Sequence, residues 1–199
     1  MKVTKIELQK HSPDRYSIYV DDEFAVGVDR EIVYTLNLYE GLEIDANMLE
    51  RISYTEEKRK VKEKALHLLT YRARAKKELT DRLKEKGAEI NIIADVIGEL
   101  EAIGLVNDTE FTKVWVRERS KSYGSFRLRG ELIKKGIAKE IIDKALSELN
   151  ELDTANELAQ KWIDRHKNLP PIVLKRRLFS FLMRRGISYE TINSLNIFE

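Results

Sequence analysis

The sequence predicts a mainly α-helical protein, in which three tandem three-helix repeats form an elongated, curved solenoid behind a small three-stranded antiparallel β segment with a short helix. Apolar residues alternate with a period of two over the first 28 residues, and a helical period begins near residue 57. From there a pattern of 49 and then 50 residues recurs. We expect a β-rich segment over 1–56 and helical repeats over 57–104, 105–152 and 153–199.

The N-terminal segment has the alternation of β-strands. The residues of the alternating face are Tyr16, Ile18, Val20, Phe24, Val26 and Val28. With a turn at "HSPD", this pattern predicts an antiparallel meander from about Val3 to Val28. The link Asp21-Asp22-Glu23 is predicted to be a hairpin turn rather than a carboxylate metal cluster. Asp29 is suited to cap a short helix, and another helix is expected from near Asp45.

The three repeats align on Gly87, Gly136 and Gly186. A Leu stands eight and another four residues before each glycine, and an Ile stands six residues after it. A glycine with positive φ ends a helix, so each repeat should hold a middle helix, a stop at the glycine and a third helix. The expected first helices are 61–74, 108–121 and 154–166, with Asn107 as the cap of the second and Asp153 as the cap of the third.

Positive charge gathers in the first and middle helices of each repeat, although the net charge is only +2. Residues 62–86 hold 9 basic and 4 acidic side chains, residues 111–135 hold 8 and 2, and residues 161–185 hold 8 and 1. If the repeats stack in register, these helices would line one continuous basic surface that suits a polyanion. The alternative is that acidic neighbours balance much of this charge within the protein.

Arginine clusters interleaved with aromatic residues favour the first of these interpretations, because Arg presents a planar donor fork to phosphate or carboxylate. The candidate contact residues are Arg72, Arg74, Lys76, Lys77, Arg117, Arg119, Lys121, Tyr123, Arg127, Lys134, Lys135, Lys175, Arg176, Arg177, Arg184 and Arg185. Arg129 lies between two apolar flanks of its helix and is expected to be a structural ion-pair residue. The three repeat glycines are likewise structural, and Trp115 and Trp162 lie in apolar stripes typical of a core.

The sequence offers no catalytic or metal site. His11, His67 and His166 show no ligand spacing, and the phosphate-loop, GxGxxG and GxSxG motifs are absent. The absence of Cys excludes disulfides and thiolate chemistry, and no apolar run approaches the roughly 18 residues of a membrane span. We therefore expect a soluble, cytoplasmic and monomeric binding protein without a cofactor, rather than an enzyme.

Nearly the whole chain resembles the bacterial RecX regulatory proteins. The most specific part is residues 104–137, "GLVNDTEFTKVWVRERSKSYGSFRLRGELIKKGI", and the first repeat contributes "ALHLLTYRARAKKELTDRLKEKG". The β-rich start, "KIELQKHSPDRYSIYVDDEFAVGV", is similar to that of some Gram-positive members. The chain departs from the family pattern at Asn107 and Thr112, where an acidic residue and an Ala usually stand.

The resemblance implies a modulator of RecA, the recombinase that forms filaments on single-stranded DNA. Such a protein would bind the filament and single- or double-stranded DNA, and would inhibit RecA ATPase and strand exchange in recombination, DNA repair and the SOS response. Two other functions stay open, a non-catalytic single-stranded DNA-binding module and a helical adaptor for an acidic protein. The abrupt end at "TINSLNIFE" suggests a sequence that lacks a C-terminal portion.

Overall fold

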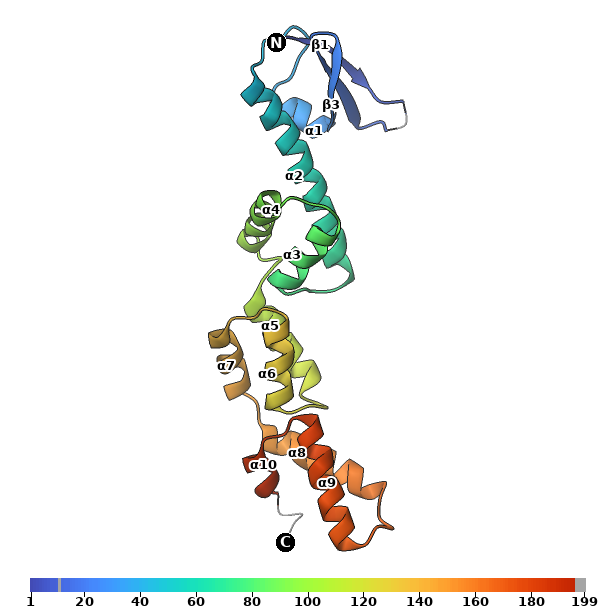
Figure 1. Cartoon of the computed structure of the whole chain (residues 1–199), viewed down its shortest axis with the longest axis vertical. Helices are drawn as coiled ribbons and strands as arrows, with labels where there is room; N and C mark the ends of the chain where they lie inside the picture. Colours follow the sequence, from blue (N-terminus) through green and yellow to red (C-terminus); the bar gives the residue numbers. More distant parts are fainter. Residues whose placement is uncertain (11, 196–199) are drawn as a thin grey trace. The chain divides into compact units, whose positions relative to one another are not determined.

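The computed structural model describes residues 1–10 and 12–195 (Figure 1). These residues form two compact units. One unit holds residues 1–72 and 80–102, and the other holds residues 73–79 and the chain from Ile103 onward. The fold is mainly helical with one small sheet, as the sequence predicts, and the end of the third repeat, residues 196–199, lies outside the described residues. The elongation and curvature of the solenoid stay predictions. None of the described helices is long and apolar enough to cross a membrane.

The sheet is the predicted meander. Its strands β1 (Val3–Leu8), β2 (Arg15–Val20) and β3 (Glu23–Asp29) pair antiparallel in the order β1-β2-β3. The β2–β3 hairpin turns through Asp21 and Asp22, whose φ angles are +48° and +66°. Positive φ at two successive residues gives a turn whose twist matches that of the strands. The acidic link is therefore a hairpin turn.

The sheet packs against α1 (Arg30–Thr35) and against α2 (Ala46–Tyr71) (Figure 1). Helix α1 begins at the predicted cap, because the Asp29 side chain accepts a hydrogen bond from the Glu31 N–H. Helix α2 begins near Asp45 as expected, and the Asp45 side chain accepts a hydrogen bond from the Met48 N–H. The fully or almost fully buried side chains of this core include Val3, Ile18, Val28, Ile32 and Ile52.

A buried carboxylate fixes the sheet to α2. Glu56 is 1% exposed, accepts a hydrogen bond from the Asp29 N–H at 3.0 Å and pairs with Arg15 at 2.8 Å. Burial by itself would raise the pKa of Glu56, but hydrogen bonds from Arg59 and Arg15 outweigh it and lower the pKa. The carboxylate is therefore ionised at neutral pH and holds β2, β3 and α2 together.

Helix α2 is longer than the sequence predicts. It runs without a break over 26 residues, whereas separate helices were expected from near Asp45 and over 61–74. No Gly or Pro interrupts this stretch, so one helix serves both the sheet and the first repeat. The helix ends earlier than residue 74, with Arg72 extended at φ −170°, because the chain must turn to place Ala75 in the core of the second unit.

The first repeat continues with α3 (Lys76–Glu85) and α4 (Ile90–Ala102). Its buried residues include Val61, Ala65, Leu83, Ile93, Val96 and Leu100. Polar contacts also join α2 to α4, since the Tyr54 hydroxyl donates to Asp95 at 2.6 Å and Glu99 pairs with both Lys58 and Lys62 at 2.8 Å.

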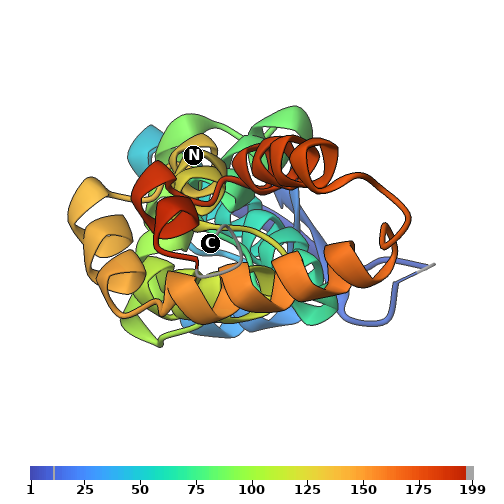
Figure 2. The same ribbon diagram turned by 90° about the horizontal axis from the view of Figure 1, so that it is seen from below.

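The second repeat comprises α5 (Asp108–Arg119), α6 (Ser125–Lys134) and α7 (Lys139–Ser147). The third comprises α8 (Glu151–Asp164), α9 (Pro171–Arg185) and α10 (Tyr189–Asn193), with α8 and α9 side by side (Figure 2). Asn107 caps α5 as predicted. The cap predicted at Asp153 is wrong, because α8 begins earlier and the Asn150 side chain accepts a hydrogen bond from the Asp153 N–H at 3.3 Å.

All three repeat glycines lie in the left-handed region, with φ values of +80° at Gly87, +77° at Gly136 and +79° at Gly186. At Gly186 the missing side chain also permits a close contact. An added Cβ would lie 2.5 Å from the Arg127 Cβ and 2.6 Å from the Arg127 backbone nitrogen. The end of α9 therefore meets the start of α6 at a distance that only glycine allows.

Backbone hydrogen bonds complete this junction between the second and third repeats. The carbonyl oxygens of Arg185 and Gly186 accept from the N–H groups of Gly124 at 3.0 Å and Phe126 at 3.1 Å. The first N–H groups of a helix have no partner within that helix, and Gly124, the N-cap of α6, has no side chain to supply one. The third repeat thus provides the cap that α6 lacks.

Glu151, the first residue of α8, caps two helices at once. One carboxylate oxygen accepts from the Ser125 N–H at 2.6 Å, and the other accepts from the Ser188 N–H at 3.2 Å and the Thr191 hydroxyl at 2.9 Å. Burial alone would raise the pKa of Glu151, but hydrogen bonds from Ser125, Ser188 and Thr191 outweigh it and lower the pKa. The ionised carboxylate therefore stabilises the starts of α6 and α10.

The same arrangement recurs one repeat earlier in the second unit. Asp108, the first residue of α5, accepts a hydrogen bond from the Lys76 N–H at 2.8 Å, where α3 begins. A Cβ on Gly136 would lie 2.5 Å from Cδ of Lys77. In both cases two features of a repeat contact the middle helix of the repeat before it. These features are an acidic residue at the start of the repeat and the glycine after its own middle helix.

Replacing Gly186 by Ala tests this docking. We expect G186A to lose about 3 kcal/mol of unfolding free energy, since a left-handed L-residue costs roughly 1–2 kcal/mol and the new Cβ collides with backbone. Urea unfolding followed by far-UV circular dichroism measures the loss. G87A is the matched control, because Gly87 has nearly the same φ and open space around it, and should lose only about 1 kcal/mol. Equal losses in the two variants would contradict the docking contact.

The shared cap at Glu151 predicts a pH dependence. Because its pKa is lowered on folding, the carboxylate adds stability above its unfolded pKa of about 4.3, and this is lost as the pH falls further. Glu151→Gln should cost about 1–3 kcal/mol at neutral pH, since an amide offers one acceptor where two sets of donors converge. The difference from the unmodified protein should narrow below about pH 4 in urea titrations.

Glu157→Gln provides the comparison on the same helix. Glu157 is exposed and only pairs with Lys161 at 3.1 Å, so its replacement should change stability by less than about 0.5 kcal/mol at any pH. A pH profile for Glu151→Gln that parallels that of the unmodified protein would mean that Glu151 is not the titrating cap.

Candidate interaction surface

The described residues contain no cluster of three or more potential metal ligands. His67 lies edge-on to Tyr71, with ring centroids 5.1 Å apart, and His166 stacks on Trp162 at 4.0 Å. His11 lies outside the described residues. The two described histidines therefore pack against aromatic rings, and the surface chemistry that remains to be explained is that of the cations.

Many of the candidate cations are paired inside the protein. Arg119 and Arg127 share Glu131, at 2.7 Å and 3.2 Å, and Lys135 pairs with Glu78 at 3.1 Å. Further candidates pair as Arg74 with Glu78, Arg117 with Glu118 and Lys121 with Glu118. Arg129, expected to be a structural ion-pair residue, contacts Asp143 of α7. Acidic side chains of the protein itself thus balance a large part of the positive charge, which is the alternative that the sequence left open.

Tyr123 lies at the centre of an arginine cluster. Its ring centroid is 4.5 Å from the guanidinium carbon of Arg119, 3.9 Å from that of Arg127 and 5.3 Å from that of Arg185. Arg185 also donates to the Ser122 carbonyl at 3.4 Å. Because these arginines come from α5, α6 and α9, the Tyr123 ring helps to join the second and third repeats.

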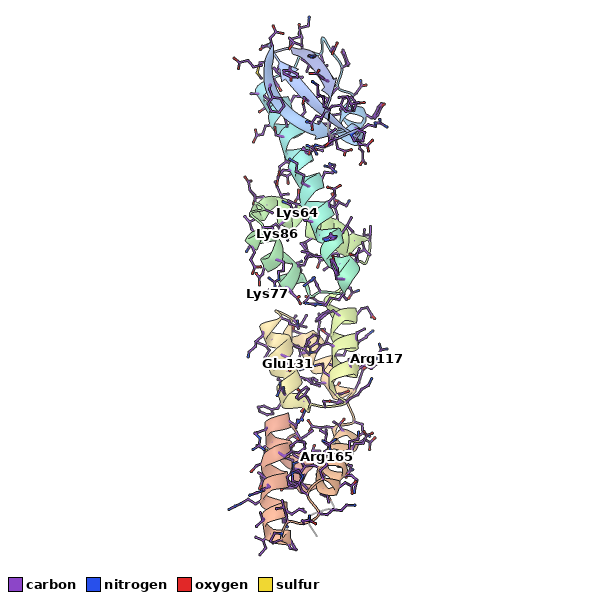
Figure 3. The ribbon with its side chains drawn as sticks, turned by 90° about the vertical axis from the view of Figure 1, so that its right-hand side faces the viewer. Lys64, Lys77, Lys86, Arg117, Glu131 and Arg165 are labelled. Atoms are coloured by element: carbon purple, nitrogen blue, oxygen red, sulfur yellow. The ribbon has the colours of Figure 1, made fainter. Side chains whose placement is uncertain are left out.

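Glu131 is the carboxylate partner of this cluster, and Figure 3 labels it on α6. It accepts from the Trp115 ring N–H at 3.2 Å as well as from Arg119 and Arg127. Burial would raise the pKa of Glu131, and the hydrogen bonds of Arg119 and Arg127 outweigh it and lower the pKa. Glu131 is therefore ionised and holds both arginines in place.

A smaller set of candidates keeps its positive charge exposed. Among the described residues, Lys134 on α6 and Arg176, Arg177 and Arg184 on α9 are exposed and make no ion pair. Arg177 and Arg184 are two helical turns apart and so share a face of α9. These four side chains keep their charge available to solvent.

Lys134, Arg184 and Arg127 converge on one groove between α6 and the end of the third repeat. The groove has a volume of about 710 Å³ and is lined by apolar as well as charged side chains. Phe126 is 77% exposed, Tyr189 62% and Met183 45%, and all three line it. The third repeat thus adds Met183, Arg184 and Tyr189 to a surface that begins on α6.

Arg117 and Lys121 do not line this groove. Arg117 lines a separate hollow of about 220 Å³ between α5 and α7, together with Val116 and Leu149, and Figure 3 shows it on α5. The first and middle helices of the second repeat therefore do not present all their cations to one groove. Lys121 is exposed beside Glu118 at the end of α5.

The remaining sequence candidates lie near the start of α3 and on α9. The Lys76 N–H is bound by Asp108, the Lys77 side chain lies against Gly136, and Arg72 follows the last residue of α2. Lys175 is exposed on α9. Trp115 and Trp162, expected in the core, are partly buried, and Trp162 also stacks on Phe181 at 6.0 Å.

From the sequence, Phe126 is one of the aromatic residues interleaved with the arginine clusters, whereas Met183 and Tyr189 were not singled out. Phe126 lies outside the stripe of Leu128 and Leu132 that α6 buries, and this offset was visible in the sequence. Met183 and Tyr189 carried no such signal, because their exposure depends on where the third repeat docks. Thr112, which replaces the usual Ala, is fully buried, and its hydroxyl donates to the Asp108 carbonyl at 2.6 Å.

Comparison with known proteins gives the same family over each part of the chain. Four family models match: the regulatory protein RecX N-terminal domain over residues 1–45, and the RecX first, second and third three-helix domains over residues 62–100, 107–146 and 150–195. The chain is similar to a crystal structure of regulatory protein RecX, with a TM-score of 0.78, 26% identity and 98% of both chains covered. A second similar structure, RecX from Lactobacillus salivarius, has a TM-score of 0.65 and 25% identity and covers 70% of this chain and 94% of that one.

Curated relatives carry the same name. Regulatory protein RecX of Clostridium perfringens is 32% identical, with 98% of this chain and 94% of the relative covered. The RecX of Clostridioides difficile is 35% identical over 96% of this chain and 92% of the relative, and that of Bacillus subtilis is 34% identical over 96% and 75%. These matches and the three glycine-stopped repeats place the chain in the RecX family of regulatory proteins.

Proposed function

We propose that this protein is a monomeric cytoplasmic regulator that binds RecA filaments and their DNA and inhibits RecA ATPase and strand exchange in recombination, DNA repair and the SOS response. Membership of the RecX family supports the regulatory role. The observation that carries the proposal is the groove on which Arg127, Lys134 and Arg184 converge. A RecA filament on single-stranded DNA offers both phosphates and protein, and the groove offers both cations and apolar surface.

The geometry favours contact through few residues. Arg127 is held by Glu131 and the Tyr123 ring, so its position is fixed before any partner arrives. Lys134 and Arg184 are exposed without ion pairs among the described residues and are available for new ones. A partner would therefore gain charge contacts without breaking existing pairs, which keeps the cost of binding low.

Reversing the two unpaired groove cations tests the proposal. We expect K134E combined with R184E to raise the concentration that half-inhibits RecA ATPase on single-stranded DNA by roughly tenfold, because two attractive contacts become repulsive. K139E combined with K144E makes the same charge change on α7, away from the groove, and should change inhibition less than about twofold. If the α7 variant lost as much inhibition as the groove variant, net charge rather than this surface would be responsible.

Salt dependence gives an independent measurement. Each neutralised phosphate of a single strand contributes a slope of about −0.7 in log K against log salt, so the four unpaired cations set a limit of about −3, whereas all fifteen candidate cations would predict about −10. Fluorescence titration of labelled oligothymidylate at several salt concentrations measures this slope. Binding to RecA without DNA, measured in parallel, separates a filament regulator from a plain DNA-binding module.

A further inference from the structure

We infer that the groove between α6 and the α9–α10 end of the third repeat holds an acidic peptide segment of a protein partner, with a bulky apolar side chain of that segment seated on the groove floor. This inference rests on the proposed function, because it names the part of the partner that the groove would recognise. Its basis is the combination of an apolar floor with unpaired cations on both walls.

The groove has room because α6 carries a glycine at its centre. An added Cβ on Gly130 would meet nothing within 4 Å, and Gly130 lines the groove together with Phe126 on the same helix. Glycine is a poor choice for a helix interior, where Ala would stabilise the helix by about 1 kcal/mol. The gap at Gly130 is thus open space beside an exposed aromatic ring.

The α9–α10 wall carries apolar side chains beside Arg184. Ile187, which is 2% exposed, and Met183, which is 45% exposed, both line the groove. The Tyr189 ring is held edge-on against Phe179 at 6.0 Å. Met183 lines the groove together with Phe126 and Tyr189, and a flexible thioether accommodates many apolar side-chain shapes, so the groove suits a Leu, Met or Phe side chain.

Charge on the groove is positive but interrupted. Lys134 and Arg184 contribute one cation from each wall, without ion pairs among the described residues. Glu131 also lines the groove, ionised and shared between Arg119 and Arg127. A partner that places carboxylates at the two walls and an apolar group between them would match this pattern.

Nucleic acid fits the same pattern less well. A nucleic acid strand carries a phosphate on every nucleotide, and a groove that follows it needs a continuous positive track. Here Lys134 and Arg184 are the lining cations that make no ion pair among the described residues, and the exposed apolar side chains of Phe126 and Met183 line the same groove, so the positive charge is not continuous along it. An acidic peptide can leave its central position uncharged, so we assign the groove to protein.

The test uses the full chain and a labelled synthetic peptide with a central Phe and Asp or Glu on both sides. We expect fluorescence anisotropy to give a Kd of about 10–100 µM at low salt, as for a short segment with one anchor. Replacing the central Phe by Ser should weaken binding by roughly tenfold. Equal binding of the Ser peptide would overturn the inference, because charge alone would then explain it.

Variants locate the binding site. Gly130→Leu should fill the groove and weaken peptide binding by at least roughly tenfold, while keeping the far-UV circular dichroism spectrum. Gly98→Leu is the matched control, since Gly98 is also a helical glycine with nothing within 4 Å of an added Cβ and lies on α4. R184E provides a second variant that leaves the shape of the groove floor in place. Unchanged peptide binding in both groove variants would overturn the assignment.

Labelled oligothymidylate is the competing probe. If Gly130→Leu weakened oligothymidylate binding but not peptide binding, the groove would be a nucleic-acid site and the inference would be wrong. RecA ATPase inhibition, measured on the same proteins, reports separately on the proposed function. Unmodified protein that binds the peptide but does not inhibit RecA would overturn the proposed function alone, and the reverse result would overturn this inference alone.

Discussion

The carbonyl groups of Arg185 and Gly186 and the carboxylate of Glu151 supply the acceptors that the start of α6 lacks. An unpaired buried N–H costs roughly 1–3 kcal/mol, and Gly124 has no side chain to satisfy one. Helix α6 is therefore completed only when the third repeat is docked on it. In a tandem array whose repeats contact only their neighbours, such contacts couple the stability of adjacent repeats. Asp108 caps the start of α3 in the same way, so the coupling recurs along the second unit.

The groove follows from this junction. Because α9 ends where α6 begins, Phe126 and Lys134 of α6 and Met183 and Arg184 of α9 line the same hollow. A single repeat contains only one wall. The Tyr123 cluster adds three arginine contacts from both repeats and keeps the walls together. The candidate site is thus a property of a docked pair of repeats, and any change that loosens the junction acts on binding as well as on stability.

The helices and strands could largely be predicted from the sequence, but the ion-pair partners of the charged side chains could not. Alternation and glycine spacing are local signals, so the meander, its hairpin turn and the helices around each glycine were predictable. The change in pattern near residue 57 suggested a boundary between elements and so concealed the single long helix α2, although no Gly or Pro interrupts it. Asn150 was missed as a cap because Asp153 is an equally good cap residue three positions later. The groove depends on how the third repeat docks, and no local pattern encodes that contact.

A count of charges along the chain does not reveal which cations are paired within the protein. Residues 111–135 hold 8 basic and 2 acidic side chains, but Lys135 finds Glu78, 57 positions away, and Arg129 finds Asp143 on the next helix. One carboxylate, Glu131, serves two arginines. Paired cations act mainly as internal connections, since their field is largely cancelled at the surface. The few unpaired cations beside exposed apolar side chains then favour a partner that matches both features, because binding gains from burying apolar area as well as from charge.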